Sequence, residues 1–345
     1  MENKADILSM MPEELSEFVV SLGEKSFRAK QLFSWMHKGA QIGEMSNLPA
    51  AFREKLTEAA DYRLPRIEEK YVSKIDGTVK YLFSMIDGEC VESVFMRYEH
   101  GNTLCVSSQA GCRMGCKFCA STLKGRTRDL YPSEILGQVI AAQRDTGERI
   151  SGIVMMGIGE PLDNYDNTIR FLRLVSHPDG LNIGLRHISL STCGLTERFN
   201  DLADRDMQLT LSVSLHAPDD ETRTRIMPAN RGRGVDELFR CCSEYYQRTG
   251  RRISFEYAMI DGVNDSAEQA ELLARRVKPL SAHVNLIPLN HVEERDFAPS
   301  TPANLRRFVE ILEKNGVNVT IRRRLGSDVD ASCGQLRRKN MKGKA

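Results

Sequence analysis

The sequence lacks the features that would place the protein in a membrane or outside the cell. No apolar run in its 345 residues approaches the roughly 20 residues that a membrane helix needs. The first residues, M-E-N-K-A-D-I-L-S-M-M-P-E-E, are too acidic and too interrupted for a signal peptide. We therefore expect a cytoplasmic protein with no membrane partner. In a reducing compartment structural disulfides are disfavoured, and clustered cysteines indicate metal ligands or catalytic groups.

A strong net charge is also absent. The chain has 48 Lys and Arg residues against 47 Asp and Glu residues, for a net charge of +1, so no global field attracts nucleic acid. A polyanion would have to be held by local basic patches. Three segments qualify, each of which could equally be a solvated surface: 124–128, 322–324 and the basic tail 337–345.

The chain contains no internal repeat, and its pattern predicts an α/β fold. Residues 1–62 space apolar residues at three and four, which predicts a helical accessory domain. Residues 63–100 are rich in β formers and carry Asp-Gly turns at Asp76 and Asp87, which predicts a β-meander. From 101 to 336, strands alternate with amphipathic helices, as in a parallel sheet or β/α barrel. The expected strands are 103–108, 152–157, 187–192, 209–215, 253–260, 283–289 and 317–321.

Chemically unusual residues follow the ends of most of these strands. They lie at 112–119, 157–161, 191–194, 214–218, 290 and 327–336. Active sites of parallel β/α folds are built from the loops at the carboxyl ends of the strands. The sequence therefore predicts one site assembled from six loops.

Three cysteines, Cys112, Cys116 and Cys119, lie within eight positions with the spacing C-x3-C-x2-C. Zinc modules usually supply four ligands, often as two C-x2-C pairs, and no second pair is present. A 4Fe–4S cluster takes one thiolate per iron. Three cysteines would leave the fourth iron open to a small molecule with an amine and a carboxylate. We favour an iron–sulfur site, with zinc or a chance thiol cluster as the alternatives.

Several motifs resemble one family. The C-x3-C-x2-C motif, with Phe118 before its third cysteine, is the signature of the radical S-adenosylmethionine (SAM) superfamily. T-L-C-V-S-S-Q-A-G-C, G-I-G-E-P-L-D-N, S-L-H-A-P, N-L-I-P-L-N and D-A-S-C-G-Q-L are similar to the RlmN/Cfr family of RNA methyltransferases, over residues 20–337. The resemblance implies a partial (β/α)6 barrel with the helical domain and a β-hairpin extension. It also implies methylation of adenosine carbon 2 in 23S rRNA, at the peptidyl transferase centre, and in tRNA at position 37.

The resemblance assigns the cofactors as well. One 4Fe–4S cluster on the three cysteines would bind SAM, with electrons from a donor such as flavodoxin or ferredoxin. The SAM contacts of the family map onto Gly159, Glu160, Ser191, Ser214, Leu215, His216 and Asn290. Glycines allow close backbone approach to a ligand, and a carboxylate can accept from an ammonium group. Taken singly, Glu160 could be a helix-start carboxylate and His216 a satisfied core histidine.

Two further cysteines are implied as reactive groups, because carbon 2 of adenine has no lone pair with which to attack a sulfonium. Cys333 would carry the methyl group, taken as a thiolate from a first SAM. A second SAM would supply the radical that joins this carbon to the base. Cys105 would then free the product by forming a disulfide with Cys333. The family match also assigns Glu92 as the base that removes the carbon-2 proton, although a solvent-facing strand residue is its simpler interpretation.

Alternatives remain at this point. A Cfr-type enzyme would methylate carbon 8 of the same adenosine, and Pro161 favours carbon 2 because Cfr commonly has alanine there. A zinc-stabilised RNA-binding protein without catalysis is the second alternative. Lys25, Arg28 and Lys30 of the N-terminal domain offer a possible further RNA contact. The other cysteines, which we expect to be buried small hydrophobes, are Cys90, Cys193, Cys241 and Cys242. We expect a monomer.

Overall fold

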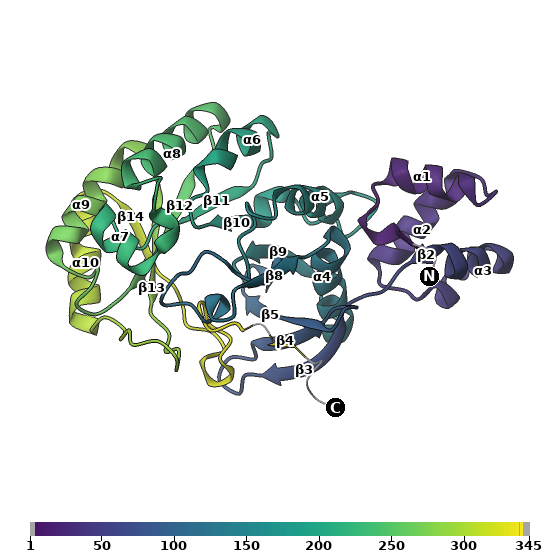
Figure 1. Cartoon of the computed structure of the whole chain (residues 1–345), viewed down its shortest axis with the longest axis horizontal. Helices are drawn as coiled ribbons and strands as arrows, with labels where there is room; N and C mark the ends of the chain where they lie inside the picture. The colour runs from purple at the N-terminus through teal and green to yellow at the C-terminus, as the bar shows by residue number, and fades with distance from the viewer. Residues whose placement is uncertain (1–3, 338, 341–345) are drawn as a thin grey trace.

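The computed structural model describes residues 4–337 and 339–340. Three helices open the chain, as the spacing of apolar residues predicts: α1 (Pro12–Ser21), α2 (Phe27–His37) and α3 (Ala50–Ala59). Each buries an apolar face, with Leu15, Phe33 and Phe52 almost fully excluded from solvent. In Figure 1 these helices lie together at the right, beside α4 and α5 of the main body.

A single mixed sheet of eleven strands forms the centre of the described chain, in the order β14-β13-β12-β11-β10-β9-β6-β5-β4-β3, with β15 against β5. All neighbouring pairs from β6 to β14 are parallel. These strands are β6 (Gly101–Cys105), β9 (Ile150–Met155), β10 (Ile188–Thr192), β11 (Thr210–Ser214), β12 (Ile253–Met259), β13 (His283–Pro288) and β14 (Asn318–Ile321). The predicted α/β class and all seven expected strands are confirmed. The parallel part thus has seven strands, one more than the six of the expected (β/α)6 barrel.

The predicted meander is present and continues this sheet. It consists of β3 (Arg66–Val72), β4 (Val79–Ser84) and β5 (Glu89–Tyr98), joined at the two Asp-Gly turns. Gly77 and Gly88 have φ values of 72° and 87°, which only glycine adopts readily. Because β5 pairs antiparallel with β6, the meander forms one wall of the open barrel.

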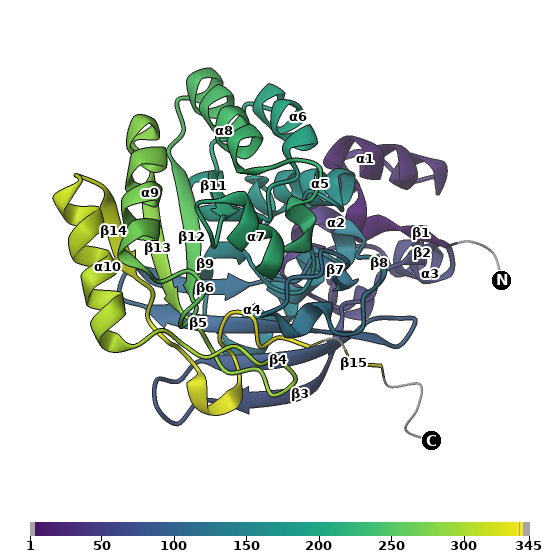
Figure 2. The same cartoon turned by 60° about the vertical axis from the view of Figure 1, so that its left-hand side comes forward.

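Helices cover the outer side of the curved sheet in both views (Figures 1 and 2). They are α4 (Pro132–Thr146), α5 (Tyr165–Ser176), α6 (Phe199–Asp204), α7 (Asp220–Ile226), α8 (Val235–Thr249), α9 (Ala267–Val277) and α10 (Pro302–Lys314). Phe171, Phe255 and Phe308 are fully buried where helices meet strands. No helix among the described residues has the length and apolarity to span a bilayer.

Polar contacts fix the N-terminal helices to the main body. Ser133 donates to Ser9 Oγ (2.9 Å) and to Asp6 Oδ2 (2.7 Å). The ring of His37 is buried and accepts from the amide of Leu181 (3.3 Å), and Lys30 pairs with Asp179 (2.9 Å). The Lys30–Asp179 pair lies at the surface, with 72% of the Lys30 side chain exposed.

Most of the predicted basic tail, residues 338 and 341–345, lies outside the described residues. Within it, β15 (Lys339–Asn340) pairs antiparallel with Glu89 and Cys90 of β5.

Candidate active site

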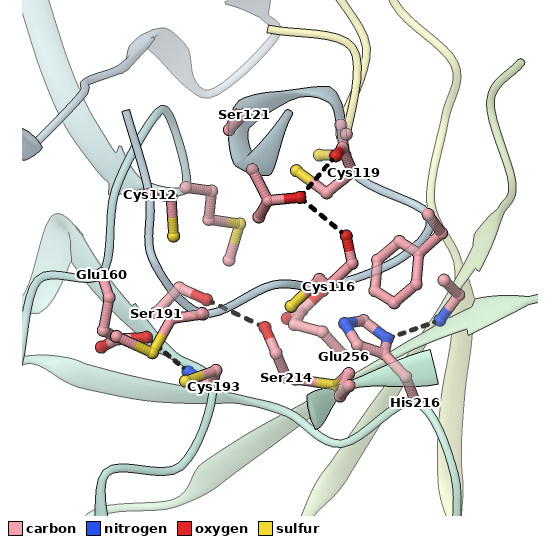
Figure 3. Close-up of a pocket in the computed structure, with 18 of the residues that line it drawn as sticks. Cys112, Cys116, Cys119, Ser121, Glu160, Ser191, Cys193, Ser214, His216 and Glu256 are labelled. Atoms are coloured by element: carbon pink, nitrogen blue, oxygen red, sulfur yellow. Dashed lines mark hydrogen bonds between the residues drawn. The ribbon is translucent and has the colours of Figure 1, made fainter. Parts of the chain in front are cut away.

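A pocket lies at the carboxyl ends of the parallel strands, where the six unusual loops meet. It holds about 920 Å³ of space, including its open mouth. Most of the residues predicted from sequence line it: Cys112, Cys116, Cys119, Gly159, Glu160, Ser191, Ser214, His216, Asn290 and Cys333. Figure 3 shows the thiols of the three clustered cysteines facing the same space. The side chains of Leu215, Cys105 and Glu92 are not part of this lining.

The cysteine loop is held by side chains around it. Thr122 Oγ1 donates to the carbonyls of Cys116 (2.9 Å) and Cys119 (3.0 Å), and Arg295 Nη2 donates to the carbonyl of Cys119 (3.2 Å). Burial raises the pKa of the Cys112 thiol to about 12 and raises the pKa values of the Cys116 and Cys119 thiols. These thiols need a nearby positive charge to ionise, which is what a bound metal centre provides.

The donor set fits an iron–sulfur cluster better than zinc. Among the described residues, no group of three or more His, Cys, Asp or Glu side chains is placed to hold one metal ion. A structural zinc site requires four ligands around a single point. A 4Fe–4S cluster takes one thiolate per iron, so three thiols spread around a pocket suit it. The zinc alternative therefore finds no support in the geometry.

The loop after β9 depends on Gly159 and Glu160. Gly159 has a φ of +113°, and a Cβ there would come within 2.7 Å of both Gln109 N and Ser108 Oγ. The Glu160 carboxylate is buried and accepts from the amides of Cys193 (2.7 Å) and Leu162 (3.0 Å). Burial raises the pKa of this carboxyl group. Glu160 thus lines the pocket and also joins the loops after β9 and β10.

Hydroxyl groups from β10 and β11 face each other in the pocket. Ser191 Oγ and Ser214 Oγ are 3.5 Å apart, on adjacent parallel strands. Such hydroxyls can both donate to and accept from the ribose and carboxylate of a ligand. Asn290 also lines the pocket, and its Nδ2 donates to the carbonyl of Cys333 (3.1 Å).

His216 is both a hydrogen-bonded core histidine and part of the pocket lining, the two roles that the sequence allowed. It has a positive φ of 57°, and its Nδ1 accepts from the amide of Ala258 (2.9 Å), as a core histidine would. Burial lowers its pKa to about 3, so the ring is neutral and carries its proton on Nε2. The ring also lines the pocket, edge-on to Phe118 at 4.9 Å. The neighbouring Leu215 is fully buried and can offer a ligand only its backbone.

Sequence reasoning missed Arg223 of α7, which is only 2% exposed. Its guanidinium donates to the carbonyls of Leu215 (3.0 Å), Cys193 (2.7 Å) and Ser214 (3.1 Å), and to Asn230 Oδ1 (2.5 Å). It therefore joins the loops that follow β10 and β11. The only signal in the sequence was its position three residues before the buried Ile226, on the same helix face.

The loop that carries Cys333 is bonded directly to the cysteine loop. Ala120 donates its amide to the carbonyl of Gly334 (2.7 Å), and Ser121 Oγ donates to the carbonyl of Leu336 (2.8 Å). Cys105, the last residue of β6, is buried nearby. Burial, with a smaller effect of the Cys333 thiolate, raises the pKa of Cys105 to about 12. All nine cysteines of the chain carry free thiols.

Two of the three basic patches differ from the surface patches that we expected. Arg322 lies in the pocket, where its Nη1 is 3.7 Å from Glu256 Oε2 and 3.1 Å from Met156 Sδ. In segment 124–128, Arg126 and Arg128 pair with acidic side chains: Asp129 and Asp163 for the first, Asp87 and Glu134 for the second. Glu256 carried no local motif, and Arg322 was marked only as part of the basic segment 322–324, so the sequence identified neither as a pocket residue.

Glu92 is buried, with 2% of its surface exposed, so its interpretation as a solvent-facing strand residue is wrong. Its carboxylate accepts from the amide of Arg337 (2.7 Å) and lies 3.6 Å from Lys80 Nζ. Glu92 therefore holds the end of the segment that carries Cys333. The other cysteines, Cys90, Cys193, Cys241 and Cys242, are buried as expected.

Two family models match the chain. Residues 106–277 match the radical SAM superfamily, and residues 5–61 match the ribosomal RNA large subunit methyltransferase N-terminal domain. A relative from Lachnoclostridium phytofermentans, named "Probable dual-specificity RNA methyltransferase RlmN", is 51% identical over 97% of this chain and 95% of its own length. The chain belongs to the RlmN family of radical SAM enzymes. An RlmN relative from Clostridium tetani with the same name is 50% identical over 99% of this chain and 98% of its own.

Solved structures agree with membership of the RlmN family. The crystal structure of a radical SAM methyltransferase from Sphaerobacter thermophilus matches with a TM-score of 0.93 and 40% identity, covering 96% of this chain and 99% of that one. Membership implies a 4Fe–4S cluster and SAM. The pocket around Cys112, Cys116 and Cys119 offers both the thiols and the polar groups that these ligands require.

Proposed function

We propose that this enzyme methylates carbon 2 of adenosine in RNA, with Cys333 as the methyl carrier and Cys105 as the resolving thiol. Its substrates are the peptidyl transferase centre of 23S rRNA and position 37 of tRNA. One observation carries the proposal: Cys333 lines the same pocket as Cys112, Cys116 and Cys119, on a loop bonded to theirs.

The residues of the pocket divide between two ligands. Cys112, Cys116 and Cys119 hold the 4Fe–4S cluster, which takes electrons from a donor such as flavodoxin or ferredoxin. The groups that would hold SAM are the backbone of Gly159 and Leu215 and the side chains of Glu160, Ser191, Ser214, His216 and Asn290, most of which line the pocket. When bound, the two supply a primary carbon radical, and two SAM molecules are used per turnover.

The protein groups then act in order. Cys333, as a thiolate, accepts a methyl group and becomes a thioether. The primary carbon radical takes a hydrogen atom from this methyl group, whose carbon then bonds to carbon 2 of the adenine. The base gives its carbon-2 proton to a protein base, and its remaining unpaired electron would return to the iron–sulfur cluster, which has lost one electron in the cleavage of SAM. Cys105 attacks the sulfur of Cys333, so an S–S bond forms, the S–CH2 bond breaks and the carbon takes up a proton as a methyl group.

Glu92 is our candidate for the base that removes the carbon-2 proton. Its burial beneath the Cys333 segment supports a place near the reaction, and a carboxylate acts as a base when its proton-accepting oxygen reaches the substrate. Because Arg337 N and Lys80 now engage it, Glu92 reaches the substrate only if the Cys333 segment moves.

The remaining parts of the chain have supporting roles in this proposal. Residues 1–62 form an accessory domain that contacts RNA, 63–100 form the β extension, 101–336 form the catalytic core and 337–345 a basic tail. Lys25 is the cation of the N-terminal patch that we assign to RNA, since Arg28 and Lys30 pair with Glu24 and Asp179. The enzyme acts as a monomer.

The test uses protein reconstituted anaerobically with iron and sulfide, then incubated with protein-free 23S RNA or tRNA, SAM and a reductant. Nucleoside mass spectrometry identifies the product against 2-methyl and 8-methyl standards. We expect 2-methyladenosine from the wild type and from Cys241→Ala, a control thiol outside the pocket, but none from Cys333→Ala. A carbon-8 product would refute the choice of carbon, and methylation by Cys333→Ala would refute the carrier.

A further inference from the structure

A second cavity opens on the other side of Arg322 from the cysteine loop. It holds about 1340 Å³ of space, including its open mouth, and its lining comes mostly from β9 to β13, with Tyr98 of β5 and the Arg322–Arg323 pair after β14. It shares three lining residues with the active-site pocket, namely Met156, Glu256 and Arg322. The two spaces therefore meet at the Glu256–Arg322 pair.

Both reactive thiols lie close to this junction. Arg322 lines the active-site pocket together with Cys333, and its positive charge lowers the pKa of the Cys105 thiol, against the larger effect of burial. Burial raises the pKa of Tyr98, which lines the second cavity, and Arg322 and the two cysteines act on it more weakly. The cluster cysteines and the polar groups assigned to SAM line the first pocket alone. A substrate in the second cavity would therefore approach the active-site pocket past the Glu256–Arg322 pair.

The chemistry of the second cavity suits a nucleotide. Four arginines and one carboxylate line it: Arg251, Arg252, Arg322, Arg323 and Glu256. Arg252 and Arg323 are exposed, and neither has an acidic partner among the described residues, in contrast to Arg126 and Arg128. Exposed arginines without partners are suited to hold phosphates.

The inner end of this cavity presents groups that match the edge of adenine. Arg322 offers N–H donors to ring nitrogens, and the Glu256 carboxylate can accept from an exocyclic amine. Asn285 Nδ2 (2.8 Å) and Ser254 Oγ (3.2 Å) donate to Glu256 and hold it in place. Tyr98 stacks on His100 with ring centroids 5.2 Å apart and supplies an aromatic face for an unstacked base.

We propose that this cavity receives the target adenosine, with Arg322 and Glu256 at the edge of the base, Tyr98 beside its ring, and Arg252 and Arg323 at the flanking phosphates. The proposal rests on the function proposed above and adds the route by which RNA reaches Cys333. The mouth of this cavity, beside the exposed Arg252 and Arg323, is thus the entrance for a flipped-out or single-stranded nucleotide.

The first test compares RNA affinity among reconstituted variants. Arg252→Gln/Arg323→Gln removes two charges at the mouth, Tyr98→Leu removes the aromatic face, and Arg306→Gln on the outer helix α10 is the matched charge control. Preparations are compared at equal Cys333 methylation, measured by intact-protein mass spectrometry without RNA, so that only correctly folded, cofactor-loaded protein enters the comparison.

RNA binding should depend less on salt in the double variant. We expect the slope of the logarithm of the binding constant against the logarithm of the salt concentration to become shallower by roughly 0.7 for each lost phosphate contact. Tyr98→Leu should weaken binding about tenfold. Arg306→Gln should bind RNA like the wild type. Unchanged affinity and slope in the double variant would overturn the proposal.

Photo-crosslinking from 8-azidoadenosine at the target position gives an independent test in the wild-type holoenzyme. We expect crosslinked peptides from the cavity lining around residues 96–98, 251–254 and 322–323. Crosslinks confined to other surfaces would overturn the entry route while leaving RNA methylation intact. If the wild type neither binds nor methylates RNA, the proposed function itself fails. Failure of the entry route and failure of the proposed function are therefore distinguishable.

Discussion

Replacing Arg223 with methionine tests whether a buried cation organises the active-site loops. The substitution keeps a long side chain but removes every N–H donor. The carbonyl of Leu215 retains the amide of Ala217 as a donor (2.8 Å), whereas the carbonyl of Cys193 and Asn230 Oδ1 lose the donors that Arg223 gives them. A buried acceptor without a partner costs about 1–3 kcal/mol, so two cost about 2–6 kcal/mol.

Removing a buried charge offsets part of this cost, because burial disfavours the charged form of Arg223 and lowers its pKa. We therefore expect Arg223→Met to lower the free energy of unfolding by about 3 kcal/mol. Urea denaturation followed by far-UV circular dichroism measures the change. Arg223→Lys should lose less, because it keeps the charge and some donors.

The matched control is Arg240→Met on α8, where the arginine is exposed and its ion pairs are with Glu237 and Glu244. We expect its unfolding midpoint to stay close to that of the wild type. If Arg223→Met lay within about 1 kcal/mol of the wild type, the four hydrogen bonds of Arg223 would not stabilise these loops, and the reasoning from unsatisfied acceptors would be refuted.

Further predictions concern the pocket and the N-terminal interface. Gly159→Ala should reduce SAM affinity more than tenfold in equilibrium dialysis, since the new Cβ would lie 2.7 Å from Gln109 N at a φ of +113°. Glu160→Gln removes one buried acceptor and should weaken SAM binding about tenfold in the same assay; unchanged affinity would contradict a role for its charge. Burial, and secondarily the charge of His177, lower the pKa of His37 from 6.5 to about 3, so only the unfolded chain binds a proton there between these values. Stability should therefore fall as pH decreases through that window, by up to about 1.4 kcal/mol per unit, and His37→Gln should reduce this slope in urea titrations.

Local spacing in the sequence was sufficient for much of the fold. Short runs of β formers marked all seven parallel strands, because β-branched side chains fit the pleated surface of a sheet. The two Asp-Gly pairs located the turns of the meander, since only glycine readily takes the positive φ observed at Gly77 and Gly88.

The sequence by itself also determined the cluster motif, because the spacing of Cys112, Cys116 and Cys119 defines it. It determined the set of loops that form the pocket as well, because the carboxyl ends of parallel strands meet at one edge of the sheet. Only the tertiary structure decided the roles of Arg223, Glu256 and Arg322. Nothing local distinguishes a buried arginine from an exposed one: Arg322 and Arg323 are adjacent, yet the first enters the pocket and the second lies at the mouth of the neighbouring cavity. The burial of each arginine depends on which strands and loops, distant in the sequence, pack against its side chain. Short-range sequence patterns do not specify those contacts.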